Sequence, residues 1–107
     1  MMDAILVLST VDSVELGREL AGSLVKAGLA ACVNIIPNIR SIYRWEGRVC
    51  DERELLLVIK TRRGLFEAVR ALIRQLHTYQ VPEIIAVPVC GGDPDYLSWL
   101  AEQTGQR

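Results

Sequence analysis

Residues 31–45 constrain the fold of this chain most, because they read as a single extended strand of fifteen residues. Strands in globular proteins average about five or six residues. At about 3.3 Å per residue, an unbent strand of this length would run about 50 Å, whereas a domain of about 100 residues is only about 35 Å across. Pro37 lacks an amide donor and marks an edge, a bulge or a bend. The strand therefore either bends at Pro37 or projects beyond its own domain.

This strand continues through a turn at residues 46–48 into a second apolar strand at residues 54–60, which predicts a long hairpin. The distal part of its first strand carries large apolar side chains, namely Ile39, Ile42, Tyr43 and Trp45. A projecting strand edge with such side chains aggregates unless another chain covers it. We therefore expect a tight homo-oligomer built on the hairpin of residues 31–60. The alternative is a sharp kink that folds the ribbon back over the bare face of its own sheet.

The other apolar runs have the lengths and spacings of a small α+β domain. Residues 4–8 and 83–89 are short and rich in β-branched side chains, which is typical of strands, and Pro88 places the second run at a sheet edge. Residues 16–25 and 65–76 instead repeat apolar side chains at helical spacing. A strand and an amphipathic helix therefore precede the long hairpin, and a helix and a strand follow it.

The ends of the two helices are predicted from residues that satisfy free backbone groups. Asp12 with Glu15 resembles a capping box before the first helix, and Gly28 suits the position after it, where a left-handed conformation costs least. Thr61 is expected to cap the second helix, which ends near His77. These positions delimit the two predicted helices.

A last short helix is expected to begin with Asp93 as its cap and Pro94 at its first position. The element order is then β-α-β-β-α-β followed by a helix, which is the split βαβ, ferredoxin-like arrangement. The predicted fold class is therefore α+β, with a four-stranded antiparallel sheet, helices on one face and a long hairpin. The length of 107 residues fits one domain that spans residues 1–107.

Charge and apolar content exclude several classes of partner. The formal net charge is −1, so we expect neither nucleic acid nor an anionic membrane as a partner. The start of the chain does not read as a signal peptide, and no apolar run approaches the ~20 residues of a membrane span. Cys32, Cys50 and Cys90 are odd in number and widely spaced, which argues against a disulfide framework and favours a reducing cytoplasm.

Four stretches of the sequence together resemble one known family. They are Leu-Ala-Ala-Cys-Val-Asn at 29–34 followed by Pro37, Tyr-Arg-Trp-Glu-Gly at 43–47 followed by Ile-Lys-Thr at 59–61, His-Thr-Tyr-Gln-Val-Pro-Glu at 77–83, and Gly-Asp-Pro-Asp-Tyr-Leu-Ser-Trp at 92–99. Each stretch alone would be a weak signal, whereas the combination is specific. On these residues the chain resembles the CutA family of divalent-cation tolerance proteins over nearly its full length.

The resemblance implies a compact homotrimer of ferredoxin-like subunits, related in architecture to the PII signal-transduction proteins. It also implies a cytoplasmic location and a role in metal tolerance, with copper and other divalent cations as ligands. No enzymatic reaction common to the family comes with it. Within the chain itself no nucleophile stands beside a recognisable base and orienting group, so we expect a protein that is not an enzyme.

The metal ligands suggested for the family are only partly present. Some members carry a cysteine where this chain has Ser9, and some carry a second histidine where it has Leu76. The proline that usually follows the histidine is replaced by Thr78. His77 and Cys32 do match, and the resemblance makes these two residues the expected metal ligands.

Both matching residues also have an ordinary structural interpretation. Neutral imidazole suits copper, zinc and nickel, but one ligand does not make a site, and a trimer would supply three His77 side chains only if they converged. The alternative for His77 is a helix-terminal histidine that bonds free carbonyl groups. Cys32 is either a soft ligand for copper(I) or a small buried hydrophobe.

A second group of residues is expected to line a ligand cleft between subunits, where ligand pockets tend to form. The alternatives are an ordinary turn around Pro82 and, for the two aromatic residues of the hairpin, the core of the subunit interface. The group consists of Lys60, Tyr79, Glu83, Tyr43 and Trp45, beside His77.

Lys60, Arg62 and Arg63 stand at a strand-to-helix junction, where free amides and the helix dipole favour anions. A small anion is therefore an alternative ligand, and solvated side chains are the plainer interpretation. The predicted function is a trimeric cytoplasmic protein of the CutA type that binds copper or another divalent cation, with its ligand in intersubunit clefts. The alternative is a PII-like signalling or structural trimer that binds a small anion, a metabolite or a protein partner without catalysis.

Overall fold

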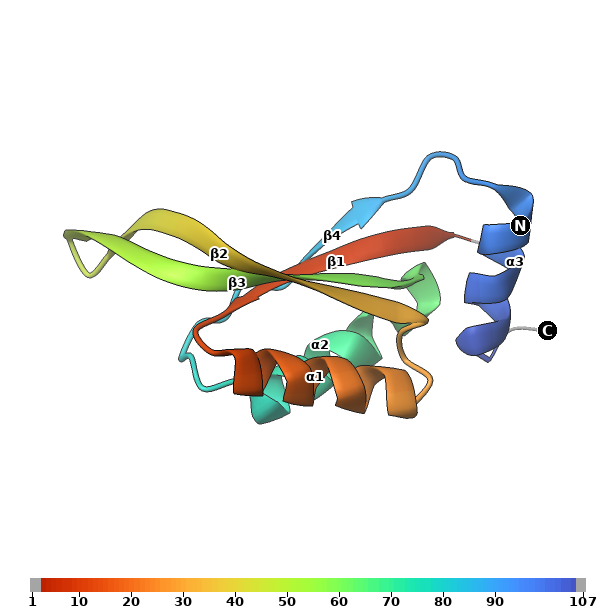
Figure 1. Cartoon of the computed structure of the whole chain (residues 1–107), viewed down its shortest axis with the longest axis horizontal. Helices are drawn as coiled ribbons and strands as arrows, with labels where there is room; N and C mark the ends of the chain where they lie inside the picture. The colour runs from red at the N-terminus through yellow and green to blue at the C-terminus, as the bar shows by residue number, and fades with distance from the viewer. Residues whose placement is uncertain (1–2, 106–107) are drawn as a thin grey trace.

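The computed structural model describes residues 3–105, which fold into β1 (Ala4–Val11), α1 (Val14–Lys26), β2 (Cys32–Trp45), β3 (Arg48–Arg62), α2 (Phe66–Leu76), β4 (Ile85–Pro88) and α3 (Pro94–Gln103). The strands form one sheet in the order β2-β3-β1-β4, and every neighbouring pair is antiparallel. Helices α1 and α2 cover the same face of the sheet, and α3 lies beyond one end of it (Figure 1). This is the ferredoxin-like α+β fold that the element order predicts.

Strand periodicity explains which residues form the core. Alternate residues of β1 and β3 point toward the helices, and they meet the inward stripes of α1 and α2. Burying an aliphatic side chain contributes about 1.5–3 kcal/mol, so this layer holds the domain together. The fully buried side chains of the layer include Val7, Val11, Leu57, Ile59, Leu20, Leu24, Val69 and Ile73.

No helix within residues 3–105 is long and apolar enough to cross a membrane.

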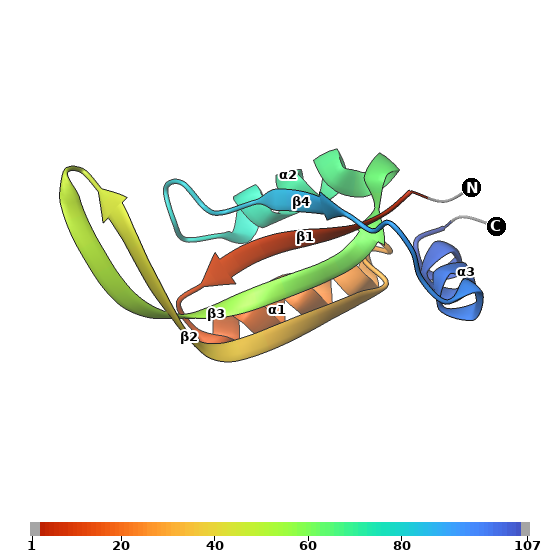
Figure 2. The ribbon, with the colours of Figure 1, turned by 90° about the horizontal axis from the view of Figure 1, so that it is seen from above.

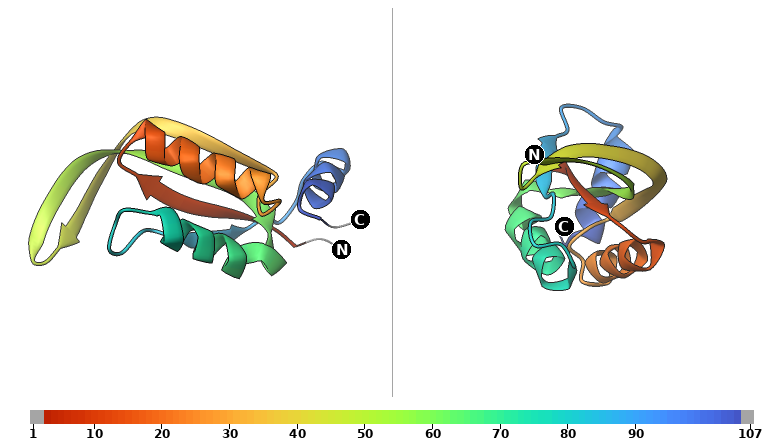
Figure 3. Two further views of the ribbon diagram at one scale, coloured as in Figure 1. Left: turned by 90° about the horizontal axis from the view of Figure 1, so that it is seen from below. Right: turned by 90° about the vertical axis from the view of Figure 1, so that its left-hand side faces the viewer.

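The opposite face of the sheet is also apolar, although α1 and α2 both lie on the other side (Figure 3). In the antiparallel register Leu6 stands opposite Val87, and Leu8 lies between Val58 and Ile85. Ile85 is 53% exposed and Val87 is 42% exposed. A contiguous apolar surface of this kind is typical of an interaction site. We call it the open sheet face.

The outer halves of β2 and β3 leave the sheet as a two-stranded ribbon, defined here as residues 39–54 (Figure 2). The register shifts between Ile36 and Ile39, and Asn38 has a left-handed φ of 62°. This bulge follows Pro37 and bends the strand. The principal extents of the molecule are 47 × 25 × 22 Å, with the ribbon at one end of the long axis. The strand therefore both bends and projects, and the ribbon does not fold back over the sheet.

Several predicted element ends are confirmed. The ribbon turns at Glu46 and Gly47, whose φ angles of 49° and 78° suit a tight hairpin between twisted strands. Gly28 follows α1 with a φ of 72°. Asp93 caps α3, because its carboxylate accepts hydrogen bonds from two backbone amides at 3.1 and 3.2 Å. Helix α2 ends at the residue before His77.

Two predicted helix caps are wrong. The cap of α1 is Ser13 rather than Asp12, because the Ser13 Oγ accepts the amide proton of Leu16 at 3.1 Å. Thr61 does not cap α2, because β3 runs past it and a turn of 3-10 helix comes before α2. Instead the buried Thr61 Oγ1 donates to the carbonyl oxygen of Leu29 at 2.7 Å. A contact between distant segments therefore uses the hydroxyl that the local pattern assigned to a cap.

The last strand is shorter than predicted. It covers Ile85–Pro88 and pairs with β1 alone, which confirms the edge position but not the start at residue 83. Glu83 and Ile84 belong to the loop that joins α2 to β4. That loop passes close to the root of the ribbon, and this places Glu83 where a site is formed.

Candidate functional site

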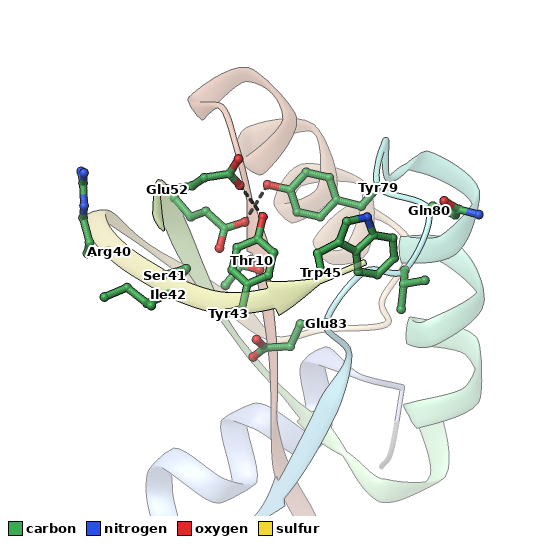
Figure 4. Close-up of a pocket in the computed structure, with 12 residues that line it drawn as sticks. Thr10, Arg40, Ser41, Ile42, Tyr43, Trp45, Glu52, Tyr79, Gln80 and Glu83 are labelled. Carbon is green, nitrogen blue, oxygen red and sulfur yellow. Dashed lines mark hydrogen bonds between the residues drawn. The ribbon is translucent and has the colours of Figure 1, made fainter. Parts of the chain in front are cut away.

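A cavity of about 690 Å³ lies at the root of the ribbon, between the ribbon and the loop from α2 to β4 (Figure 4). We call it the ribbon cavity. A volume of this order is typical of binding sites for small molecules. The ribbon and the loop supply three aromatic side chains and three carboxylates to its wall, which are Tyr43, Trp45, Tyr79, Glu52, Glu54 and Glu83.

Two hydrogen bonds from tyrosine to glutamate order this wall. The hydroxyl of Tyr43 donates to Oε1 of Glu52 at 2.5 Å, and the hydroxyl of Tyr79 donates to Oε2 of Glu54 at 2.6 Å. Burial, and then the bond to Glu54, raises the pKa of Tyr79 above its ordinary value. The bond to Glu52 is the main cause of the raised pKa of Tyr43. Both phenols therefore keep their protons at neutral pH and act as donors.

The wall of the ribbon cavity is electronegative. Among residues 3–105, Arg40 is the one basic residue in its lining, and the Nε of Arg40 is paired with Oδ1 of Asp51 at 2.8 Å. The other ion pairs within residues 3–105 lie elsewhere and include none of the three cavity glutamates. Glu54 is only 5% exposed. Glu54 therefore sits in the cavity wall with the hydroxyl of Tyr79 as its hydrogen-bond partner, and no lysine or arginine of residues 3–105 forms an ion pair with it.

His77 holds the loop that carries Tyr79 into the cavity. Nδ1 of His77 accepts the amide proton of Tyr79 at 3.1 Å, and Nε2 lies 2.8 Å from the carbonyl oxygen of Thr10. The imidazole also packs against the ring of Tyr79, with 4.6 Å between the two ring centroids. Both ring nitrogens are thus hydrogen-bonded to the backbone, as expected for the structural interpretation of this residue.

The other predicted metal ligand, Cys32, lies at a different position along the strands from His77. Cys32 stands opposite Lys60, which pairs in turn with Leu6 of β1. His77 bonds Thr10, which is four residues further along β1. Since a strand rises about 3.3 Å per residue, the positions of Leu6 and Thr10 are about 13 Å apart along β1. One chain therefore does not bring His77 and Cys32 together.

The cleft residues predicted from sequence are only partly assembled in one place. Tyr43, Trp45, Tyr79 and Glu83 all line the ribbon cavity. Lys60 does not, because its Nζ lies 5.7 Å from the ring centroid of Tyr96, on the helix beyond the other end of the sheet. The Tyr43 and Trp45 side chains share a face of the ribbon as their spacing predicts.

The basic residues around the start of α2 already have protein partners. Nη2 of Arg62 donates to the carbonyl oxygen of Thr104 at 2.9 Å, and Nε of Arg63 lies 3.9 Å from Oδ2 of Asp3. With Lys60 placed over Tyr96, each of the three cations proposed for an anion is engaged by the chain itself. One donor at this junction remains open, because the buried Nε of Arg62 has no hydrogen-bond partner among residues 3–105.

Sequence reasoning missed Glu52 and Glu54, which give the cavity its charge. The signal was present in the hairpin register. A two-residue turn at Glu46 and Gly47 puts Glu52 and Glu54 on the same face of the ribbon as Tyr43 and Trp45. Of the three carboxylates in the cavity wall, the predicted cleft therefore contained only Glu83.

The side chains within residues 3–105 do not form a metal site in one chain. No group of three or more histidine, cysteine, aspartate or glutamate side chains there could hold a metal ion. His77 has no free nitrogen, and Cys32 lies a long way from it. A metal bound by these residues would need ligands from another copy of the chain.

The structure defines a ferredoxin-like α+β domain with a projecting ribbon and a cavity at its root. The chain belongs to the family described as CutA1 divalent ion tolerance protein, whose model matches residues 5–103. The family expected from the sequence motifs is therefore confirmed.

Proteins similar in sequence come from bacteria, plants and animals. The chain is 50% identical over 99 residues to the divalent-cation tolerance protein CutA of Thermus thermophilus, covering 92% of this chain and 96% of that protein. It is 48% identical over 101 residues to the chloroplastic protein CutA 1 of Oryza sativa, covering 94% of this chain. It spans only 57% of the length of that plant protein.

Solved structures share the whole architecture. The divalent cation tolerance protein of Thermus thermophilus superposes with a TM-score of 0.93 at 48% identity, over 95% of this chain and 99% of that one. The CutA1 structure from Oryza sativa gives a TM-score of 0.94 at 46% identity, over 99% and 97% of the two chains. The projecting ribbon thus belongs to a fold that these relatives share.

Proposed function

We propose that the chain acts as a homotrimer in divalent-cation tolerance and binds copper or another divalent cation between its copies. The family to which it belongs supports the tolerance role. The single observation that supports assembly is the projecting ribbon, on which Ile42 and Val49 are 68% and 67% exposed. A ribbon of this kind is stable in solution when another chain covers it. The open sheet face offers a second apolar surface to the same assembly.

Cys32 is the metal ligand that the geometry leaves available. It lies at the start of edge strand β2, it is partly exposed, and it forms no disulfide. Thiolate is a soft ligand that favours copper(I). Because one thiol does not make a site, the proposal requires Cys32 side chains from several copies, or one Cys32 with ligands from a neighbour.

Titration calorimetry with copper(I), copper(II) and zinc tests this proposal. The expected result is saturable binding at a fixed ratio per trimer, which Cys32→Ser abolishes and His77→Gln preserves. The double variant Cys50→Ser/Cys90→Ser is the matched control, because it removes the other two thiols and leaves Cys32 in place. Binding that survives Cys32→Ser and disappears in the control would contradict the assignment.

The second candidate function is the binding of a small molecule in the ribbon cavity, without catalysis. The observation that favours it is the cavity itself, whose aromatic and carboxylate wall is ordered by two hydrogen bonds. A binding role also suits a site that offers phenols and carboxylates but no activated nucleophile. The cavity opens beside the projecting ribbon, so a neighbouring copy would complete its outer wall.

We also propose that the protein works in the cytoplasm. Cys32, Cys50 and Cys90 form no disulfide, which suits a reducing compartment. Labelling of the three thiols in freshly lysed cells tests this, because complete labelling without prior reduction is expected there. Thiols that react only after reduction would indicate an oxidising compartment.

A further inference from the structure

We propose that the ribbon cavity binds an organic cation, that is, an ammonium or guanidinium group attached to a small apolar body. The proposal names the ligand class for the second candidate function and rests on it. The charge of the cavity wall, its aromatic side chains and its volume are three separate observations that lead to this class.

The charge of the wall calls for a positive ligand. Glu54 is 95% buried and accepts a hydrogen bond from Tyr79, which is a neutral donor. Within residues 3–105 no lysine or arginine pairs with Glu52, Glu54 or Glu83, and Arg40 is occupied by Asp51. A carboxylate removed from water is costly unless a positive charge or several donors compensate it. A ligand cation would supply that charge and bond the carboxylate oxygens that the tyrosines leave free.

The aromatic side chains identify the cation as organic. Tyr43, Trp45 and Tyr79 line the same cavity as the carboxylates. The face of an aromatic ring attracts a cation, most strongly for tryptophan, and aromatic sites of this type recognise ammonium ligands. The apolar part of such a ligand would pack against Val81, which also lines the cavity.

The volume of the cavity and its carboxylates argue against a metal ion and against an anion as the ligand. A cavity of about 690 Å³ has room for many waters, each with a share of about 30 Å³, and is therefore large enough for a small organic molecule. The three glutamates are not gathered as metal ligands, since no set of three acidic, histidine or cysteine side chains in the described part of the chain could hold an ion. An anion would meet three carboxylates and one arginine that is already paired.

The test uses n-butylammonium as the probe and n-butanol as its neutral control of the same chain length. The chain has two tryptophans, and their indole N–H resonances are followed in proton–nitrogen correlation spectra of the full-length protein at constant ionic strength. Trp45 lines the cavity, whereas Trp99 lies on α3. The expected result is a saturable shift of the Trp45 signal with butylammonium, no matching shift of Trp99, and no saturation with butanol.

Replacing the buried carboxylate tests which group binds the charge. Glu54→Gln keeps the shape of the side chain and an acceptor for Tyr79, and it should weaken butylammonium binding by about tenfold or more, because a charged hydrogen-bonding partner is lost. If that variant fails to fold, Glu83→Gln on the exposed rim answers the same question. Cys90→Ser, outside the cavity, should bind butylammonium like the wild type.

Three outcomes would overturn the proposal. They are equal shifts with butylammonium and butanol, equal shifts of Trp45 and Trp99, and butylammonium binding that ignores the loss of the carboxylates. A cavity that takes no probe at all would also overturn it. None of these outcomes affects the metal titration of Cys32, so failure here is distinguishable from failure of the metal proposal.

Discussion

Nε2 of His77 lies 2.8 Å from the carbonyl oxygen of Thr10, sixty-seven residues earlier in the chain. Nδ1 of the same ring accepts the amide proton of Tyr79 at 3.1 Å. Since a backbone amide only donates, Nδ1 carries no hydrogen and the Nε2 hydrogen goes to Thr10. The single histidine therefore ties the end of β1 to the loop that brings Tyr79 to the ribbon cavity. Its main role in this structure is to position that loop.

Removing the imidazole should destabilise the fold. His77→Ala loses both hydrogen bonds and should lower the free energy of unfolding by about 1–3 kcal/mol. His77→Gln is the matched variant, because its side-chain amide can still donate to Thr10, and it should cost less. Urea unfolding measures both, and nitrogen chemical shifts of the wild-type ring should show the hydrogen on Nε2. Equal stability of the alanine variant and the wild type would contradict the positioning role.

Stability should fall at alkaline pH because of Tyr43 and Tyr79. The hydrogen bond to Glu52 raises the pKa of Tyr43 above the ordinary value of about 10, and burial followed by the hydrogen bond to Glu54 raises the pKa of Tyr79 above it. Above about pH 10 the unfolded chain therefore releases phenol protons that the folded chain keeps, and the free energy of unfolding declines as pH rises. The stabilisation from these two tyrosines is complete only below about pH 10.

The alkaline loss is measured from urea midpoints near neutral pH and at about pH 11, above the ordinary tyrosine pKa. Tyr79→Phe cannot ionise at that position and should show a smaller loss between the two pH values. Tyr96→Phe is the control, since it keeps both tyrosine–glutamate pairs. An equal alkaline loss in wild type and Tyr79→Phe would show that this phenol ionises equally in the folded and unfolded chains.

Removing the buried hydroxyl groups of Ser9 and Thr61, which lie on neighbouring strands, should have different effects on the free energy of unfolding. Ser9 is fully buried and its Oγ has no hydrogen-bond partner in the described part of the chain, so Ser9→Ala should leave stability unchanged or raise it by about 1 kcal/mol. Thr61 is equally buried but donates to the carbonyl oxygen of Leu29, so Thr61→Val should cost about 1–3 kcal/mol. Denaturant unfolding of the two variants side by side checks this. A Ser9→Ala variant as unstable as Thr61→Val would reveal an interaction of the Ser9 hydroxyl.

Replacing either of two glycines at α1, Gly22 or Gly28, by alanine should change stability in opposite directions. Gly28 has a φ of 72°, so Gly28→Ala should cost about 1 kcal/mol. Gly22 lies inside α1, and an added methyl group there meets nothing within 4 Å, so Gly22→Ala should gain about 0.5–1 kcal/mol. Thermal unfolding of the two variants should move in opposite directions. A loss of stability in Gly22→Ala would mean that this face of α1 is covered in the assembled protein.

Local patterns predicted the fold well because the sequence signals agree with one another. The stripe of α1, the left-handed Gly28 and the Asp93 cap of α3 are each set by neighbouring residues. The wrong caps arose where two candidates compete or where a distant group intervenes. Ser13 stands next to Asp12, and the Thr61 hydroxyl bonds the carbonyl of Leu29 instead of a nearby amide.

The site was harder to predict because it depends on contacts between remote segments. The partner of His77 lies at the end of β1, and the partner of Tyr79 lies on β3. Spacing along the sequence carries no sign of either contact. Only the pairing register of the ribbon, which follows from its two-residue turn, could have placed Glu54 near the aromatic side chains.

The mass of the protein in solution tests the central claim, that copies of this chain assemble on the projecting ribbon. Sedimentation equilibrium of the wild type should give three times the 11.9 kDa of one chain. Trp45→Glu on the ribbon should give smaller species or aggregates, while Val25→Glu on the outer side of α1 should keep the wild-type mass. A stable wild-type monomer, with its ribbon exposed and soluble, would contradict the account.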